Sequence, residues 1–192
     1  MCEGDRFVHV TVTNNAVVRA ALGYVEANAA EMDTVRDLVA LSLLAPPVTF
    51  RSNRPAHVSC RAVVATPDWE VLQSRGTPRP CWQFPGGHVE CSDASLLGSA
   101  LRQLSELTGI DPNLLRPDST LPCDLVALPV DAVPEFDEPE HVHYDFRFLL
   151  YLPCRDLVNA ADAHLRWVPV GQVPGRLGEK LRRTARLVTA HR

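Results

Sequence analysis

The chain has 192 residues, 46% of them hydrophobic, and a formal net charge of −4, which is enough length for one domain with a core and a terminal extension. The negative charge argues against a nucleic-acid-binding surface, and no apolar run approaches the roughly 20 residues that cross a bilayer. The opening residues lack the basic and then apolar order of a secretory signal, and the six cysteines form no Cys-x-x-Cys pair, so we expect a cytoplasmic protein with reduced thiols, no membrane contact and no nucleic-acid partner.

The first quarter of the chain has a mainly helical pattern. Residues 7–13 alternate in polarity and predict a short strand, and residues 15–44 then place apolar side chains at helical spacing. We expect a break near 28–33 and an end at Pro46 and Pro47, because proline cannot continue a helix. Residues 1–46 are therefore predicted to be an N-terminal helical extension packed on a main domain of residues 47–192.

The middle of the chain changes to strands and then to the strongest helical pattern. "AHVSCRAVVAT" (56–66), "WEVLQS" (69–74) and "CWQF" (81–84) favour strands, and the last of them leads into the glycine pair at 86–87. Residues 94–108 predict a helix with Leu97, Leu101 and Leu104 on one face. Ser92 or Asp93 is expected to cap its start, and Gly109 is suited to its left-handed end.

The last third of the chain adds three strands and a helix. Strands are expected over 123–130, 141–152 and 164–170, with an acidic loop over 131–140, and residues 175–192 predict a basic amphipathic helix. Strands, a central helix, more strands and a final helix indicate a mixed α/β sandwich.

The loop and helix over 86–110 have a pattern that suits phosphate and metal chemistry. A glycine pair lets the backbone approach a ligand closely, and carboxylates three and four residues apart on one helix can hold a hard cation such as Mg²⁺ beside substrate phosphates.

Six residues of this stretch resemble the Nudix box of the Nudix hydrolases, whose pattern is Gly-x5-Glu-x7-Arg-Glu-apolar-x-Glu-Glu-x-Gly-apolar. They are Gly87, Arg102, Leu104, Glu106, Gly109 and Ile110. The segment is most similar to bacterial Nudix proteins whose box begins "QPGGHVEPGDASL". Those proteins also carry a downstream "HxHYDxRF", matched here by 141–148, and a helical extension before a phrase like "AHVSCRAVV". The resemblance covers nearly the whole chain and implies a Nudix-type α/β/α sandwich with a mixed sheet and an N-terminal helical extension.

The box is degenerate at its acidic end. The segment that reads Arg-Glu-apolar-x-Glu-Glu in the family is Arg-Gln-Leu-Ser-Glu-Leu at 102–107 in this chain. Of the three metal-binding glutamates only Glu106 is kept; Gln103 offers a neutral oxygen and Leu107 offers none. The resemblance implies catalytic roles for Glu106, Gln103 and Arg102, the last as a brace that pairs with Glu106.

Two further acids stand near the box. Asp93 falls where the first acid of the box would lie, and Glu90 belongs to the glycine loop. The expected metal ligands are therefore Glu106, Glu90 and Asp93. Because a dication site depends on its count of charged ligands, the Mg²⁺ or Mn²⁺ is expected to be weakly bound or absent.

A second set of candidate residues lies on the strand over 141–152. His141, His143, Asp145 and Arg147 alternate, so they point to one face, where they could bind a phosphate, a sugar hydroxyl or a transition metal. Arg147 is a candidate phosphate clamp. With Gly86, Gly87 and His88 they form the predicted substrate-binding set. The acids at 135, 137, 138 and 140 are either a solvated loop or the source of a catalytic base.

Three functions stay open. The first is a hydrolase that cleaves a pyrophosphate bond in a nucleoside diphosphate derivative with a divalent metal. The second is a catalytically impaired protein that binds or senses such a ligand, and the third is a repurposed biosynthetic enzyme that uses the same pocket. In each case the expected partner is a small phosphorylated molecule, and a homodimer is compatible with the sequence.

Overall fold

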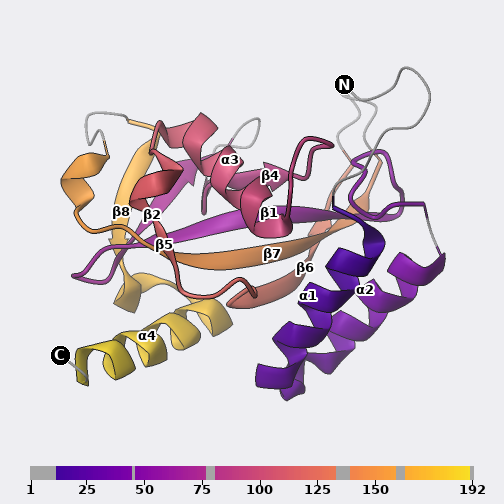
Figure 1. The fold of residues 1–192 in the computed structure, drawn as a ribbon, viewed down its shortest axis with the longest axis horizontal. Helices are drawn as coiled ribbons and strands as arrows, with labels where there is room; N and C mark the ends of the chain where they lie inside the picture. Colours follow the sequence, from indigo (N-terminus) through magenta and orange to yellow (C-terminus); the bar gives the residue numbers. More distant parts are fainter. Residues whose placement is uncertain (1–11, 45, 77–80, 133–138, 159–162, 191–192) are drawn as a thin grey trace.

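The computed structural model describes residues 12–44, 46–76, 81–132, 139–158 and 163–190 (Figure 1). Most of the predicted strand over 7–13 and three acids of the acidic loop (Glu135, Asp137 and Glu138) lie outside these ranges. No helix within them is both long and apolar enough to cross a membrane.

Apart from the strand over 7–13, the predicted elements are present with boundaries shifted by one or two residues, and two short strands that were not predicted, over 86–88 and 116–117, are added. The helices and strands are α1 (Asn14–Ala27), α2 (Met32–Leu44), β1 (Ala56–Ala65), β2 (Glu70–Arg75), β3 (Trp82–Gln83), β4 (Gly86–His88), α3 (Leu96–Thr108), β5 (Arg116–Pro117), β6 (Asp124–Val130), β7 (His141–Tyr151), β8 (Leu165–Pro169) and α4 (Gly175–Ala190).

The described strands form one mixed sheet with β1 and β7 at its centre. These two strands run parallel, in register from the pair Ala56 and Val142 to the pair Ala65 and Tyr151. β7 also pairs antiparallel with β5 and β6, and β1 with β2 and β4, while β2 pairs with β3 and β8. Nine of the ten β1 residues are buried, as expected for a central strand covered on both faces.

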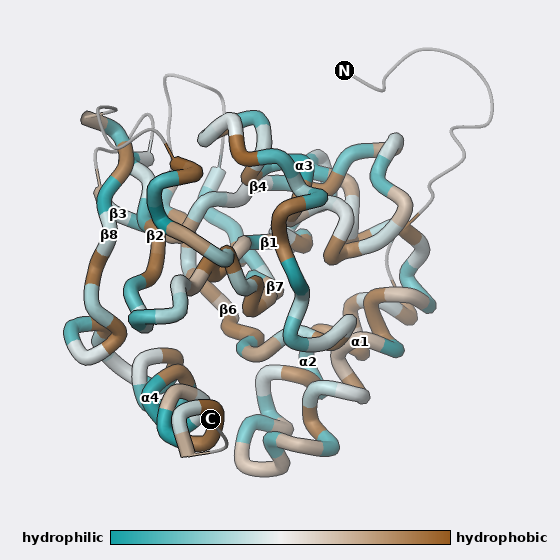
Figure 2. The backbone as a smooth tube through the Cα atoms, turned by 60° about the vertical axis from the view of Figure 1, so that its left-hand side comes forward, coloured by the Kyte–Doolittle hydropathy of each residue, from teal (hydrophilic) through white to brown (hydrophobic). Residues whose placement is uncertain are grey.

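Helices cover both faces of the sheet. Helix α3 lies on one face and α4 on the other (Figures 1 and 2). The alternation of β1 explains this division: Ala62 and Val64 pack in a cluster with Leu104 of α3, whereas Val63 packs in a cluster with Leu177 of α4.

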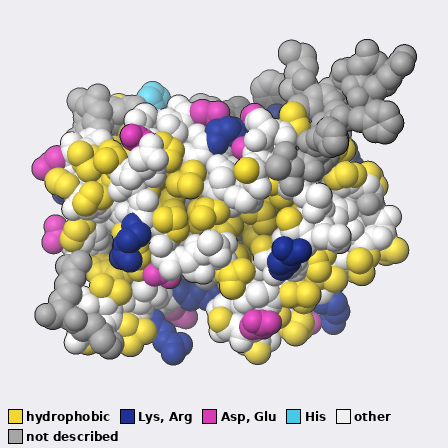
Figure 3. All heavy atoms as spheres, in the orientation of Figure 1, with side chains coloured by type: hydrophobic (Ala, Val, Ile, Leu, Met, Phe, Trp, Pro, Cys, Tyr) yellow, Lys and Arg dark blue, Asp and Glu magenta, His cyan; other side chains and the backbone are white. Residues whose placement is uncertain are grey.

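The α1–α2 pair packs beside β6, and its buried residues share a cluster with Val58 and Cys60 of β1 and with Leu96 of α3. The predicted α/β/α sandwich with a mixed sheet and N-terminal helices is confirmed. On the face seen in Figure 3, hydrophobic side chains gather near the centre and charged ones of both signs are scattered around them.

The N-terminal helices are joined to the rest of the fold by a network of charged groups. A short 3-10 turn (Ala29–Glu31) separates α1 from α2, in agreement with the predicted break. Tyr24 of α1 is buried, and its hydroxyl contacts both Glu31 and Lys180 of α4. Glu31 also forms ion pairs with Lys180 and Arg176, at 2.9 and 3.0 Å, and both bases reach the buried Asp124 of β6.

Helix α3 begins two residues later than predicted. Ser95 is its cap, and the Ser95 hydroxyl accepts a hydrogen bond from the backbone N–H of Gly98 at 2.9 Å. The predicted cap at Ser92 or Asp93 was therefore wrong. The Asp93 carboxylate turns toward Arg102 instead, with an Nε–Oδ1 distance of 2.7 Å. Asp93 therefore does not cap the helix, because its carboxylate forms a stronger, charge-assisted hydrogen bond with Arg102.

The other features of α3 agree with the sequence pattern. Leu104 is fully buried and Leu97 and Leu101 are partly buried in the same cluster beneath the helix. Gly109 ends the helix with φ 72°, in the left-handed region that glycine adopts without steric cost. The leucine face therefore fixes which side of α3 carries the box residues.

Candidate functional site

The glycine pair of β4 allows close packing within the protein. A Cβ on Gly86 would lie 2.2 Å from the carbonyl oxygen of Cys60 and 2.7 Å from Cα of Arg61, both backbone atoms of β1. A Cβ on Gly87 would lie 2.8 Å from Oε1 of Gln103 on α3. The space freed by these two missing side chains is filled by the protein, so the pair brings β4 against both β1 and α3.

The guanidinium of Arg102 forms ion pairs with all three acids that were predicted to hold a metal. Arg102 Nε and Nη2 donate to the two carboxylate oxygens of Asp93 at 2.7 and 3.0 Å. Its Nη1 lies 3.1 Å from Glu106 and 3.2 Å from Glu90, and its Nη2 also donates to the His88 carbonyl at 3.1 Å. The predicted pairing of Arg102 with Glu106 is present. Glu90 and Asp93 meet the same arginine.

The three acids differ in how firmly they are held. Asp93 is buried, which alone would raise its pKa, but hydrogen bonds from Arg102 and from the backbone N–H of Glu90 outweigh burial and lower the pKa. The same Asp93 contact raises the pKa of Arg102. The side chains of Glu90 and Glu106 are each 56% exposed. Both carboxylate oxygens of Asp93 are therefore occupied by Arg102, whereas the carboxylates of the two glutamates face solvent.

The two altered box positions are both visible in the structure. The Gln103 amide nitrogen donates to the His88 carbonyl at 3.2 Å, so this side chain supports β4. Leu107 is 48% exposed, and its side chain offers no ligand atom where the family has an acid. The residues that fit a hard cation are thus Glu106 and Glu90, beside an arginine that already neutralises part of their charge.

Four imidazoles meet at the end of the β1–β7 pair. The rings of His57, His88, His141 and His143 lie with centroids 4.6 to 5.0 Å apart in every pair that is in contact. We call this group the histidine cluster. His57 and His141 are buried, and the other two are partly exposed. The sequence predicted that His141 and His143 share one face and put His88 of the glycine loop in the same substrate-binding set, but it missed His57.

The missed member follows from strand pairing. Parallel β1 and β7 place His57 directly beside His143, and β4 adds His88 opposite Ser59. The alternation of His57, Ser59 and Arg61 along β1 was visible in the sequence. The register between β1 and β7 decides which residue lies beside His57, and a local sequence pattern carries no information on that register.

Two rings of the histidine cluster, those of His88 and His143, are uncharged at neutral pH. Burial and the neighbouring imidazoles lower the pKa of His88 to about 3 and that of His143 to about 3. Both rings are therefore neutral at pH 7, and each carries one unprotonated nitrogen.

Asp145 and Arg147 continue along β7 but are engaged in internal ion pairs. The fully buried Asp145 carboxylate accepts hydrogen bonds from Ser59 at 2.8 Å and from Arg61 and Arg147 at 3.0 Å. Arg147 also donates to Asp124 at 3.1 Å. Burial alone would raise the pKa of Asp145, but the two guanidinium groups lower it. To clamp a phosphate, Arg147 would have to leave one of these carboxylates.

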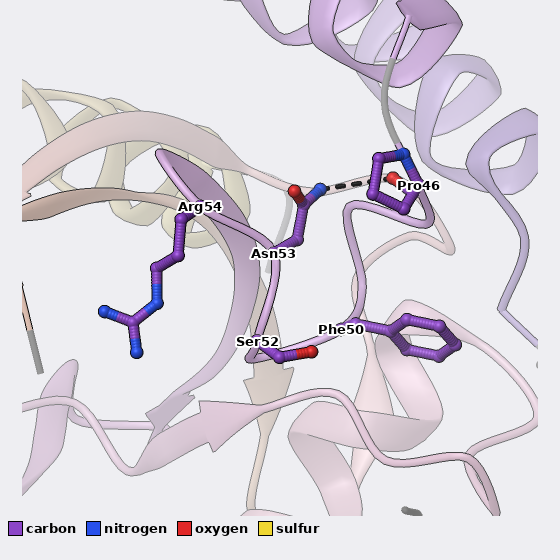
Figure 4. Close-up of a pocket in the computed structure, with 5 residues that line it drawn as sticks. All are labelled: Pro46, Phe50, Ser52, Asn53 and Arg54. Atoms are coloured by element: carbon purple, nitrogen blue, oxygen red, sulfur yellow. Dashed lines mark hydrogen bonds between the residues drawn. The ribbon is translucent and has the colours of Figure 1, made fainter. Parts of the chain in front are cut away.

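A small pocket adjoins the histidine cluster. Its volume is about 250 Å³, slightly below the usual range for ligand sites. The Asn53 amide donates to the Pro46 carbonyl, and Arg54 and Phe50 extend to different sides (Figure 4). The Asn53 carbonyl faces His57 Nδ1 at 3.2 Å, which joins the pocket to the cluster. Its lining consists of Pro46, Phe50, Ser52, Asn53 and Arg54.

Comparison with known proteins identifies the fold. The model of the NUDIX domain matches residues 55–188. The Ap4A hydrolase of C. elegans, in a binary complex, has a TM-score of 0.52 at 18% identity and covers 69% of this chain and 98% of that one. The dihydroneopterin triphosphate pyrophosphohydrolase of E. coli has a TM-score of 0.46 at 20% identity, over 61% and 82%. The isoleucine–tRNA ligase of Thermobifida fusca is 39% identical over 77 residues, which are 39% of this chain and 7% of that protein.

Proposed function

Because the chain belongs to the Nudix family, we propose that it is a Nudix hydrolase-like protein that cleaves a pyrophosphate bond in a nucleoside diphosphate derivative with Mg²⁺ or Mn²⁺. In this proposal residues 47–192 form the Nudix-fold domain and residues 1–46 are its helical extension. The retained glutamate of the box supplies the main carboxylate, and the glycine loop and histidine-bearing strand contact the substrate.

The observation that supports the proposal best is the position of Glu106. Its carboxylate is held by Arg102 one turn earlier on α3, and it is still exposed to solvent next to the equally exposed Glu90. Mg²⁺ usually keeps several waters and takes only one or two carboxylates together with substrate phosphates. Two exposed glutamates therefore suffice for a weak site.

The roles of the surrounding residues follow from their contacts. Glu106 and Glu90 would hold the ion, which when bound neutralises phosphate charge and activates water. Asp93, with both oxygens bound to Arg102, keeps the arginine in place. Gln103 and Arg102 together hold the His88 carbonyl, so they fix the end of the glycine loop.

The test compares three proteins with a panel of nucleoside diphosphate derivatives in Mg²⁺ or Mn²⁺. We expect the wild type to release nucleoside monophosphate slowly and Glu106→Gln to lose about 100-fold or more of that rate, because the charge stabilisation by a metal is worth several kcal/mol. The double variant Gln103→Glu/Leu107→Glu should be faster than the wild type.

The alternative is a binding protein without turnover, and the exposed Leu107 favours it because this side chain offers no ligand atom at its position in the box. Turnover by the double variant alone would establish that reading. Calorimetric binding of a nucleoside diphosphate whose bridging oxygen is replaced by methylene would then show whether the wild type still takes the ligand.

A further inference from the structure

We propose that His57, His88 and His143 form a binding site for a transition-metal dication of the Zn²⁺ or Co²⁺ type, separate from the carboxylates around Arg102. The site does not depend on pyrophosphate hydrolysis. It concerns nitrogen ligands on the sheet, whereas the proposed function uses oxygen ligands on α3.

The spacing of the nitrogen atoms suits such an ion. One ligand atom from each of the three histidines can be chosen so that all lie within 4.8 Å of one another. The Nε2 atoms of His88 and His143 are 3.3 Å apart. Two nitrogen ligands of a tetrahedral zinc, each about 2.0–2.1 Å from the ion, lie about 3.3–3.4 Å apart. This pair therefore already has the separation that one ion requires.

The three ligands come from three paired strands. His57 lies on β1, His143 beside it on β7, and His88 on β4, which pairs antiparallel with β1. Arg102 and Gln103 both donate to the His88 carbonyl, which fixes the backbone of the third ligand. A site on rigid strands loses little conformational entropy when the ion binds.

The second nitrogen of His57 is oriented as in a metal ligand. Its Nδ1 is 3.2 Å from the Asn53 carbonyl oxygen. A carbonyl can only accept, so Nδ1 carries the proton and Nε2 is the unprotonated nitrogen in the neutral ring. Histidines that bind metals commonly donate their other ring N–H to a backbone carbonyl in this way.

His141 repeats the same arrangement beside the three ligands. Its Nδ1 is 2.9 Å from the Pro139 carbonyl oxygen, to which it can donate, and its Nε2 lies 2.9 Å from the His143 Nε2. The Nε2 atoms of His88 and His141 thus both lie at hydrogen-bond distance from the Nε2 of His143, and a proton held between two of these nitrogens is what a bound dication would replace.

The type of ion follows from the donors. Neutral imidazoles suit Zn²⁺, Co²⁺, Ni²⁺ and Cu²⁺, whereas Mg²⁺ prefers oxygen. The nearest buried carboxylate on β7, Asp145, has its oxygens bound to Ser59, Arg61 and Arg147, so it is not a ligand. The site is thus built from nitrogen.

The test measures metal binding by the full chain after treatment with a chelator. Titration with Co²⁺ alone should give visible d–d absorption that saturates at one ion per chain, and equilibration with Zn²⁺ followed by elemental analysis should give the same ratio. His88→Ala and His143→Ala should each weaken Co²⁺ binding by about 100-fold or more, because even outer partners of a ligand are worth roughly 10- to 100-fold.

Two control variants separate this site from others. His164→Ala removes an imidazole that lies outside the cluster, and Glu106→Gln removes the box carboxylate; both should bind Co²⁺ as the wild type does. Circular dichroism checks the fold, and His88→Asn replaces His88→Ala if the latter unfolds. A wild type that binds no Co²⁺, equal binding by the cluster variants, or an equal loss in either control would overturn the proposal.

Discussion

The acids around Arg102 and the histidine cluster lie on opposite sides of one residue, His88, and they are built in opposite ways. The backbone carbonyl of His88 belongs to the first group and its ring to the second. In the first group the potential metal ligands are charged carboxylates. Two of the three acids are exposed, and all three already form ion pairs with the guanidinium of Arg102. In the second group the ligand atoms are imidazole nitrogens: the rings of His88 and His143 are neutral, and those of His57 and His141 are buried.

This difference implies that the two proposed metal sites depend on different properties of their ligands. A hard cation depends on the number of negative ligands, so replacing two glutamates by Gln103 and Leu107 removes most of its attraction. Imidazoles bind through lone pairs and need no net charge, so the cluster is unaffected by these replacements. We therefore expect the acids around Arg102 to hold a hard cation only weakly, and the proposed site in the histidine cluster not to depend on them.

The largest expected effect is on stability, from Arg102→Ala. This change leaves the buried Asp93 without its guanidinium, and breaking a buried pair from one side costs about 3 kcal/mol or more of the free energy of unfolding. Urea denaturation measures it. Glu106→Gln is the control, since an exposed pair contributes about 1 kcal/mol at most. A loss below about 1 kcal/mol for Arg102→Ala would mean that this group is not a structural brace.

Gly86→Ala should come next, because it disturbs the strand that joins the two groups. The new Cβ would meet backbone atoms of β1, which cannot move aside, and overpacking of this kind costs about 1–3 kcal/mol. Gly87→Ala is the matched control, since its Cβ meets only the end of the Gln103 side chain. Thermal unfolding should rank Gly86→Ala as the less stable. The reverse order would show that β4 does not press on β1 as described.

The third prediction concerns pH. The pKa of Asp93 is lower in the folded than in the unfolded chain, so its stabilisation is present above its ordinary value of 3.8 and is lost as the pH falls below it. We expect Asp93→Asn to cost about 1.5 kcal/mol at pH 7. The gap to the wild type should close toward pH 3 in denaturation curves. A gap that is constant with pH would show that packing, not charge, is lost.

The smallest effect on stability is expected for Leu107→Glu, which sharpens the contrast between the two groups. Leu107 is half exposed, so the change should alter the free energy of unfolding by less than about 0.5 kcal/mol. It adds a carboxylate beside Glu106, and Mn²⁺ binding followed by electron paramagnetic resonance should tighten about 10-fold. Leu107→Gln, with no added charge, should not tighten it. Equal tightening in both variants would contradict the role given to charge.

Local patterns predicted the parts of the fold and site that depend on local forces. The leucine face of α3 and its end at Gly109 follow from helix periodicity and from glycine's access to the left-handed region. The shared face of His141 and His143 follows from strand alternation.

What the sequence did not reveal depends on contacts between distant segments. The cap at Ser95 is decided by the capture of Asp93 by Arg102, nine residues away on the next turns. His57 meets His141 and His143 through a parallel register with a strand that lies 86 residues further along, as the Ser59–Asp145 contact shows. Neither pairing leaves a periodic signal in the chain.

The contact between Tyr24 and Lys180 sets a condition on how the molecule is assembled. These residues are 156 positions apart, so the network that seats α1 cannot close until α4 has been synthesised. Closing so long a loop carries a large entropic cost before its contacts repay it, and contacts of this range slow folding. The N-terminal helices, although made first, are therefore expected to be among the last parts to reach their final place, and refolding followed at Tyr24 should lag behind formation of the sheet.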